Sequence, residues 1–98
     1  AKKLPSRTVL QPAQALVEQL RMVKSASEID VIRCAVHTNS AAYEKALRRI
    51  RPGVRESDLA AELEYQMRRQ GAERPSFDTI VASGTRAALP HARPTAEP

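Results

Sequence analysis

The 98-residue sequence has few aromatic residues, few glycines and a single cysteine. Cys34 has no second cysteine with which to form an internal disulfide, and one thiol alone does not make a zinc site. The three glycines are spread too widely for a glycine-rich loop that binds phosphate. No apolar run approaches the roughly 18 residues that span a bilayer, and no apolar segment after Lys2 and Lys3 marks a secretory signal. The sequence therefore predicts a protein of a reducing, cytoplasmic compartment with no membrane partner.

Apolar and charged residues are both well represented. Hydrophobic residues make up 42% of the chain and charged residues 28%, which suits one modest folded core and excludes a disordered tail. The net charge of +5 is the only feature that favours nucleic-acid binding. Many of the arginines stand at predicted helix ends, where cations are favoured, and the aromatic residues are too few for base stacking. We expect no nucleic-acid partner; a small basic helical module that binds an acidic partner or nucleic acid stays open as an alternative.

Three segments have the apolar spacing of helices, and they are residues 13–22, 26–51 and 56–70. The longest one starts with a capping box, in which Ser25 and Glu28 satisfy each other's backbone N–H groups. Pro52 and Gly53 are expected to end it. Gly71 is expected to follow the last turn of the third helix in a left-handed conformation.

Residues 77–83 favour a β-strand, because they include a Thr-Ile-Val run, and Gly84 ends it. Residues 85–98 are predicted to be a loop. A strand needs partners for its backbone donors and acceptors, and the weak run at residues 8–10 is the only other candidate. We therefore expect the partner strands outside this chain. A first residue other than methionine, Ala1, also suggests a piece of a longer protein.

Two arrangements of residues could carry chemistry. Cys34 and His37 lie one helical turn apart, but a metal site needs three or four ligands, so a buried cysteine beside a partly exposed histidine is the preferred interpretation. His91 lies between Pro90 and Pro94 on a loop after the predicted strand. An imidazole held there can donate to a carbonyl oxygen or transfer a proton near neutral pH. The alternative is an ordinary surface histidine, since no partner acid is identifiable.

Several short motifs follow one another in an order that is more specific than any of them alone. In chain order they are LRMVKS at 20–25, EI at 28–29, R-x-A at 33–35, RPGV at 51–54 followed by Glu56, DLAAELE at 58–64, GAE at 71–73, SFDTIVASG at 76–84 and ALPHA-x-PT at 88–95. This series resembles the first part of the catalytic domain of the Xaa-Pro peptidases, aminopeptidase P and prolidase, of the pita-bread metallopeptidase group.

The resemblance implies a fold, an activity and one site residue. The expected fold class is α+β: residues 20–98 would be the incomplete amino-terminal half of a pita-bread domain, with two helices and the first strand. Residues 1–19 would be a linker and the end of a preceding domain. The parent enzyme would be a homodimer that cleaves proline-containing peptides between the amino-terminal residue and proline, using two divalent ions, manganese or cobalt. His91 matches the family's active-site histidine, which contacts the scissile carbonyl or the leaving amine.

The sequence also departs from the family's pattern. The family's metal ligands, two Asp, one His and two Glu, lie beyond the last residue, and neither Asp78 nor Glu97 stands in a ligand motif. The 98 residues alone are therefore expected to bind no catalytic metal and to hydrolyse nothing. Arg55 replaces the Thr or Ser helix cap common in the family, which predicts a less firm start of the third helix. Creatinase-like and inactive, peptide-binding relatives stay open as alternatives. We also expect apolar surface left bare where the rest of the domain would pack.

Overall fold

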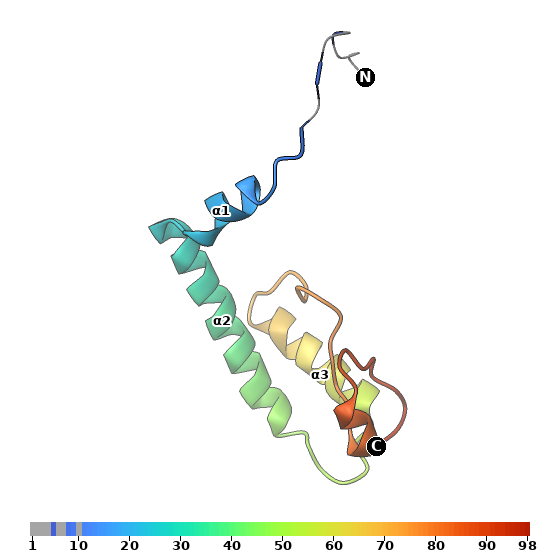
Figure 1. The fold of residues 1–98 in the computed structure, drawn as a ribbon. Coiled ribbons are helices and arrows are strands. Elements are labelled where there is room, and N and C mark those ends of the chain that lie inside the picture. The colour runs from blue at the N-terminus through green and yellow to red at the C-terminus, as the bar shows by residue number, and fades with distance from the viewer. Residues whose placement is uncertain (1–4, 6–7, 10) are drawn as a thin grey trace.

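The computed structural model describes residues 5, 8–9 and 11–98 and is mainly helical. The elements follow in the order α1 (Leu16–Met22), α2 (Ala26–Leu47), α3 (Glu56–Arg69) and the 3₁₀ helix η1 (Gly84–Ala88) (Figure 1). The three predicted helices are confirmed, although their ends differ by a few residues. Residues 1–4, 6–7 and 10, which belong to the expected linker and to the weak strand candidate, lie outside the described residues. Among the helices described, none is both long and apolar enough to cross a membrane.

α2 begins with the capping box that the sequence predicts. The N–H of Ser25 donates to Glu28 Oε2 at 2.8 Å, and the N–H of Glu28 donates to Ser25 Oγ at 3.3 Å. The bond from the Ser25 N–H favours the charged carboxylate and lowers the pKa of Glu28 from its usual value. The helix therefore has a defined start, because N–H groups that lack a partner inside the helix are satisfied.

α2 ends at Leu47, earlier than predicted. The N–H groups of Arg49 and Ile50 donate to carbonyls three residues back rather than four, at 2.9 and 3.1 Å. The last turn thus tightens before Pro52 is reached, and proline in turn disfavours helical geometry for the residue before it. Gly53 then adopts a φ of 86°, which a residue with a side chain reaches only at a cost.

α3 ends with the glycine-based cap that the sequence predicts. Gly71 has a φ of 99°, and its N–H donates to the carbonyl of Arg68 at 3.0 Å. The N–H of Ala72 donates to the carbonyl of Met67, also at 3.0 Å, which completes a Schellman motif. Gln70 is the C-cap, so the helix is slightly shorter than expected.

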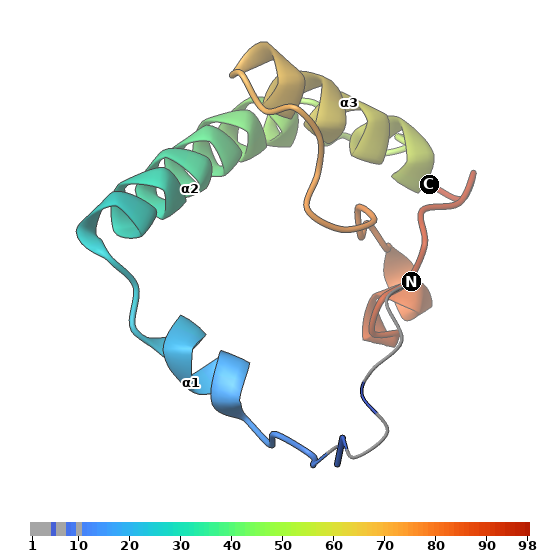
Figure 2. The same cartoon turned by 90° about the horizontal axis from the view of Figure 1, so that it is seen from above.

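α2 and α3 pack against each other through small side chains. Ala42 and Ala46 of α2 and Ala60 of α3 are buried, which lets the two helix backbones approach closely. α1 packs against neither of these helices, and Figure 2 shows it apart from them. The molecule accordingly extends over 66 × 32 × 26 Å.

Much of the apolar surface of α2 is bare, as expected from the sequence. Ile32, Val36 and Tyr43 are 47%, 59% and 54% exposed. The buried residues of α2 are confined to its second half, because α3 covers only that part. A row of large apolar side chains therefore faces no other described element.

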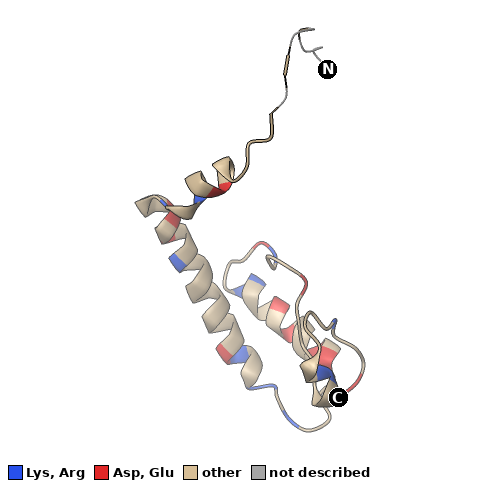
Figure 3. Ribbon diagram, in the orientation of Figure 1, with Lys and Arg blue, Asp and Glu red and all other residues tan. Residues whose placement is uncertain are grey.

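The charged residues are spread over several elements (Figure 3). Glu56 and Asp58 lie in the first turn of α3, and Arg68 and Arg69 lie in its last turn. Each pair has the sign that the helix end favours. Arg49 and Arg51, in contrast, lie beyond the last residue of α2, so helix ends account for only part of the basic charge.

The strand expected at residues 77–83 is not present. In the part of the chain that the structure describes, no segment is a β-strand, and residues 77–83 have no regular secondary structure. A strand is defined by backbone hydrogen bonds to a neighbouring strand, and no such neighbour is among the described residues. The α+β class is therefore not found, and the described fold is helical. Thr79 instead donates to Glu64 of α3 at 2.6 Å, and the expected loop at residues 85–98 overlaps η1.

Candidate functional site

The segment after η1 returns to the first turn of α3. The N–H of Glu56 donates to the carbonyl of Glu97 at 2.8 Å, and the N–H of Ser57 donates to the carbonyl of Thr95 at 2.9 Å. The Arg55 side chain makes no capping bond. Arg55 provides no side-chain cap for the first N–H groups of α3. Backbone carbonyls of Thr95 and Glu97 accept hydrogen bonds from these groups instead.

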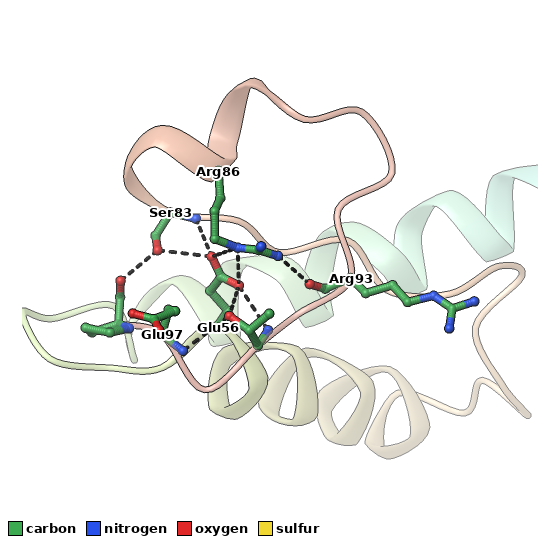
Figure 4. Close-up of polar contacts among 7 residues, drawn as sticks. Glu56, Ser83, Arg86, Arg93 and Glu97 are labelled. Atoms are coloured by element: carbon green, nitrogen blue, oxygen red, sulfur yellow. Dashed lines mark hydrogen bonds and ion pairs between the residues drawn. The ribbon is translucent and has the colours of Figure 1, made fainter.

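The side chain of Glu56 lies at the centre of this contact (Figure 4). Its Oε1 accepts the backbone N–H of Ser83 at 2.8 Å. Its Oε2 accepts the backbone N–H of Thr95 at 2.9 Å and the Thr95 hydroxyl at 2.8 Å. The Nε of Arg86 lies 3.3 Å from each carboxylate oxygen. One carboxylate thus accepts hydrogen bonds from a residue before η1, a residue in η1 and a residue after η1.

The Ser83 hydroxyl has two acceptors within reach. It lies 3.1 Å from Glu56 Oε1 and 2.7 Å from the carbonyl oxygen of Pro98. A hydroxyl carries one proton, so it donates to one of these oxygens at a time.

Burial and hydrogen bonding act in opposite directions on the charge of Glu56. The residue is 2% exposed, and a buried carboxylate is unfavourable unless donors and a cation compensate for lost water. The backbone N–H of Ser83 is the largest favourable contribution, followed by the groups of Thr95, and together they lower the pKa of Glu56 to about 2 although burial alone would raise it. The carboxylate is therefore ionised across the physiological pH range and can hold its donors continuously.

Arg86 extends the contact towards His91. Its Nε faces Glu56, and its Nη2 donates to the carbonyl of Arg93 at 2.9 Å (Figure 4). Ala92, between Arg93 and His91, is buried. The backbone that follows His91 is therefore held by the same carboxylate that binds Ser83.

His91 itself is exposed and has a φ of 57°. This left-handed conformation is uncommon for a residue with a side chain and persists where surrounding contacts impose it. An exposed imidazole on a fixed backbone can donate a hydrogen bond or transfer a proton to a bound molecule.

The structure separates Cys34 and His37, the other pair that the sequence offered, from this site. Cys34 is exposed, which corrects the expectation of a buried thiol, because α3 does not reach that part of α2. His37 on α2 is exposed as well. Asp78 pairs with Arg93 at 3.6 Å, and both side chains are largely exposed. Within the described ranges, no group of three or more His, Cys, Asp or Glu side chains lies close enough together to hold a metal ion.

Glu56 is the site residue that the sequence did not reveal. Its position in the sequence indicates only an acidic residue in the first turn of a helix, where negative charge is favoured. The partners Ser83, Arg86 and Thr95 lie 27, 30 and 39 residues further along the chain, beyond the reach of any local pattern. The one available signal was the absence of a capping side chain at Arg55, which leaves donors that must be satisfied from elsewhere.

The chain matches a known family over most of its length. The sequence model described as "Metallopeptidase family M24" matches residues 30–98. The chain is 45% identical over 76 residues to the Xaa-Pro dipeptidase of Pyrococcus furiosus, which covers 78% of this chain and 22% of that protein.

Solved structures show the same likeness. The Xaa-Pro dipeptidase from Bacillus anthracis is 49% identical, with a TM-score of 0.82 over 88% of this chain and 24% of that one. The X-Pro aminopeptidase of Thermotoga maritima is 45% identical, with a TM-score of 0.81 over 87% of this chain and 24% of that one. The chain thus spans about a quarter of the length of these relatives. Its sequence and its fold together place it in metallopeptidase family M24.

Proposed function

We propose that this chain is the amino-terminal part of the catalytic domain of a metal-dependent Xaa-Pro peptidase. The enzyme hydrolyses the peptide bond between an amino-terminal residue and a following proline. Residues 20–98 form the amino-terminal half of the catalytic domain, and residues 1–19 are the linker and the end of a preceding domain. The observation that carries this proposal is the 49% identity, at a TM-score of 0.82, to a solved Xaa-Pro dipeptidase.

In this proposal His91 is the catalytic residue that the chain contributes. Its imidazole contacts the scissile carbonyl oxygen or the leaving proline nitrogen, where a donor stabilises the charge that develops during hydrolysis. Its place on an exposed loop with a fixed backbone supports this role. So does its match to the active-site histidine of the family that the sequence resembles.

Such an enzyme uses two divalent ions, manganese or cobalt. In this proposal, residues outside these 98 bind both ions. The residues of the described structure do not fit a metal site, because none of them form a group of three ligands. The chain by itself is expected to bind no catalytic metal and to hydrolyse nothing.

The setting of the enzyme is part of the same proposal. The substrate is a proline-containing peptide, and the enzyme is a homodimer of the cytoplasm. The names of the similar dipeptidases and aminopeptidase support the substrate class.

The experiment uses the full-length protein after removal of metals with a chelator. Mn²⁺ or Co²⁺ is added back, and release of the amino-terminal residue is followed with Ala-Pro, Ala-Pro-Ala and the control Ala-Ala. We expect metal-dependent cleavage of the proline substrates only, and the two proline substrates separate a dipeptidase from an aminopeptidase. Failure of the metal-loaded protein to cleave either proline substrate would overturn the proposal in favour of a creatinase-like or inactive relative.

A further inference from the structure

We propose that Glu56 is a positioning residue for His91: its buried carboxylate holds the two ends and the middle of the loop that carries the imidazole. The inference rests on the proposed function, because it takes His91 to be the group that meets the substrate. It adds a residue of α3 to the machinery, although Glu56 does not itself reach the reacting atoms.

The two ends of the loop are tied to different oxygens of one carboxylate. The N–H of Ser83 binds Oε1 at 2.8 Å before η1, and the N–H of Thr95 binds Oε2 at 2.9 Å after His91. Closing a loop at both ends on one buried group removes much of its conformational freedom. The carboxylate belongs to the first turn of α3, so the loop takes its position from a packed helix.

The middle of the loop is tied through Arg86. This guanidinium faces Glu56 with its Nε and holds the carbonyl of Arg93 with its Nη2 at 2.9 Å. Arg93 lies close to His91 along the chain, and the buried Ala92 separates them. Three independent tethers therefore converge on Glu56 from the loop.

The backbone of His91 explains why such tethers are needed. A φ of 57° at a histidine is unfavourable and is retained only where the surroundings impose it. If the tethers loosen, the backbone relaxes and the imidazole moves, and a displacement of about 1 Å at a catalytic group lowers the rate about 100-fold.

A carboxylate suits this task and a carboxamide does not. Every group that faces Glu56 is a donor, two of them backbone N–H groups that cannot turn away. In Glu56→Gln one oxygen becomes an NH₂ group, which meets a donor instead of accepting from it. The matched control is Asp58→Asn in the same helical turn, since Asp58 is exposed and pairs only with Arg55 among the described residues.

The test is a double-mutant cycle in the full-length, metal-loaded protein, with kcat and KM measured for Ala-Pro. We expect Glu56→Gln to lower kcat about 100-fold with little change of KM, and Asp58→Asn to leave both unchanged. The background is His91→Asn, because asparagine tolerates a left-handed backbone but transfers no proton. There Glu56→Gln should lower kcat by less than about threefold. An equal loss of kcat in both backgrounds, or none in either, overturns the inference.

A milder variant covers the case in which Glu56→Gln does not fold. Thr95→Val removes the hydroxyl, which donates to Glu56 and accepts the N–H of Glu97, and keeps the backbone N–H and the side-chain shape. We expect a loss of kcat of about tenfold in the wild-type background and none in the His91→Asn background. Equal losses in the two backgrounds count against the inference.

A readout without activity separates this inference from the proposed function. Should the full-length protein fail to cleave Xaa-Pro substrates, the proposed function is wrong, and amide hydrogen exchange then decides the role of Glu56. The reporters are the N–H groups of Arg86 and Leu89, which bond to carbonyls inside the loop. Glu56→Gln or Thr95→Val should speed their exchange by about tenfold or more, while the Ala72 amide at the far end of α3 is unaffected. Unchanged exchange at Arg86 and Leu89 would refute the claim that Glu56 holds the loop around His91.

Discussion

The Thr95 hydroxyl gives the sharpest test of how the loop around His91 is held. Its Oγ1 donates to Glu56 Oε2 at 2.8 Å and also accepts the N–H of Glu97 at 3.2 Å. Thr95→Val replaces the hydroxyl by a methyl group of similar size and leaves the backbone donor in place. The change therefore removes the hydrogen bond to the charged carboxylate and the weaker bond from the Glu97 N–H, and it leaves the carboxylate paired with its other donors.

The size of the effect follows from the geometry. A hydrogen bond to a charged acceptor contributes about 1.5–3 kcal/mol, so loss of the Thr95 hydroxyl should raise loop opening about 10- to 100-fold. Ser83→Ala is the matched comparison. The Ser83 hydroxyl divides its proton between Glu56 Oε1 at 3.1 Å and the Pro98 carbonyl at 2.7 Å. Its removal should cost about 0.5–1.5 kcal/mol and raise opening about two- to tenfold.

The assay is amide hydrogen exchange over residues 84–95 in the full-length protein at neutral pH. Thr95→Val is expected to accelerate exchange more than Ser83→Ala, and neither is expected to affect α2. An effect of Ser83→Ala as large as that of Thr95→Val would refute the reasoning, since it would mean that the described hydrogen-bond geometry does not control the loop.

Three further outcomes follow from the structure. The pKa of Glu56 is lowered from 4.5 to about 2 in the folded state, so its stabilisation of the loop is complete above about pH 4.5 and is lost as the pH falls towards 2. Loop exchange in the wild type should accelerate up to about tenfold per pH unit over this window, beyond the intrinsic pH effect, and Glu56→Gln should abolish that dependence. Ala42 is fully buried between α2 and α3, so Ala42→Leu should lower the free energy of unfolding in urea by about 1–3 kcal/mol, whereas Ala35→Leu, at an exposed position, should change it by less than about 0.5 kcal/mol. Gly53 has a φ of 86° and open space around it, so Gly53→Ala should cost about 1–2 kcal/mol from backbone strain alone in the same titration, and Gly53→Asn less.

The helices could be predicted because their start and stop signals are local. Ser25 and Glu28 are three residues apart and satisfy each other whatever the rest of the chain does. Gly71 ends α3 because a left-handed residue is needed at that point. The predicted end of the second helix was less accurate, because the tightened last turn before Pro52 depends on hydrogen-bond geometry that composition does not encode.

The site could be predicted only in part. His91 was identified through a motif, but its left-handed backbone and its tethers depend on contacts between distant segments. The role of Glu56 could not be predicted, because its partners come much later in the chain. The strand predicted at residues 77–83 is not confirmed for a related reason, since strand propensity cannot supply the partner that a strand requires.

The central claim is that this chain supplies the active-site histidine of an Xaa-Pro peptidase. The most direct measurement is kcat for Ala-Pro in the full-length, metal-loaded protein and in its His91→Asn variant, with hydrogen exchange of residues 84–95 as the check that the loop is intact. The account predicts a loss of kcat of about 100-fold or more with unchanged exchange, because the backbone is kept and the imidazole is removed. A His91→Asn variant that retains kcat within about threefold of the wild type would contradict it.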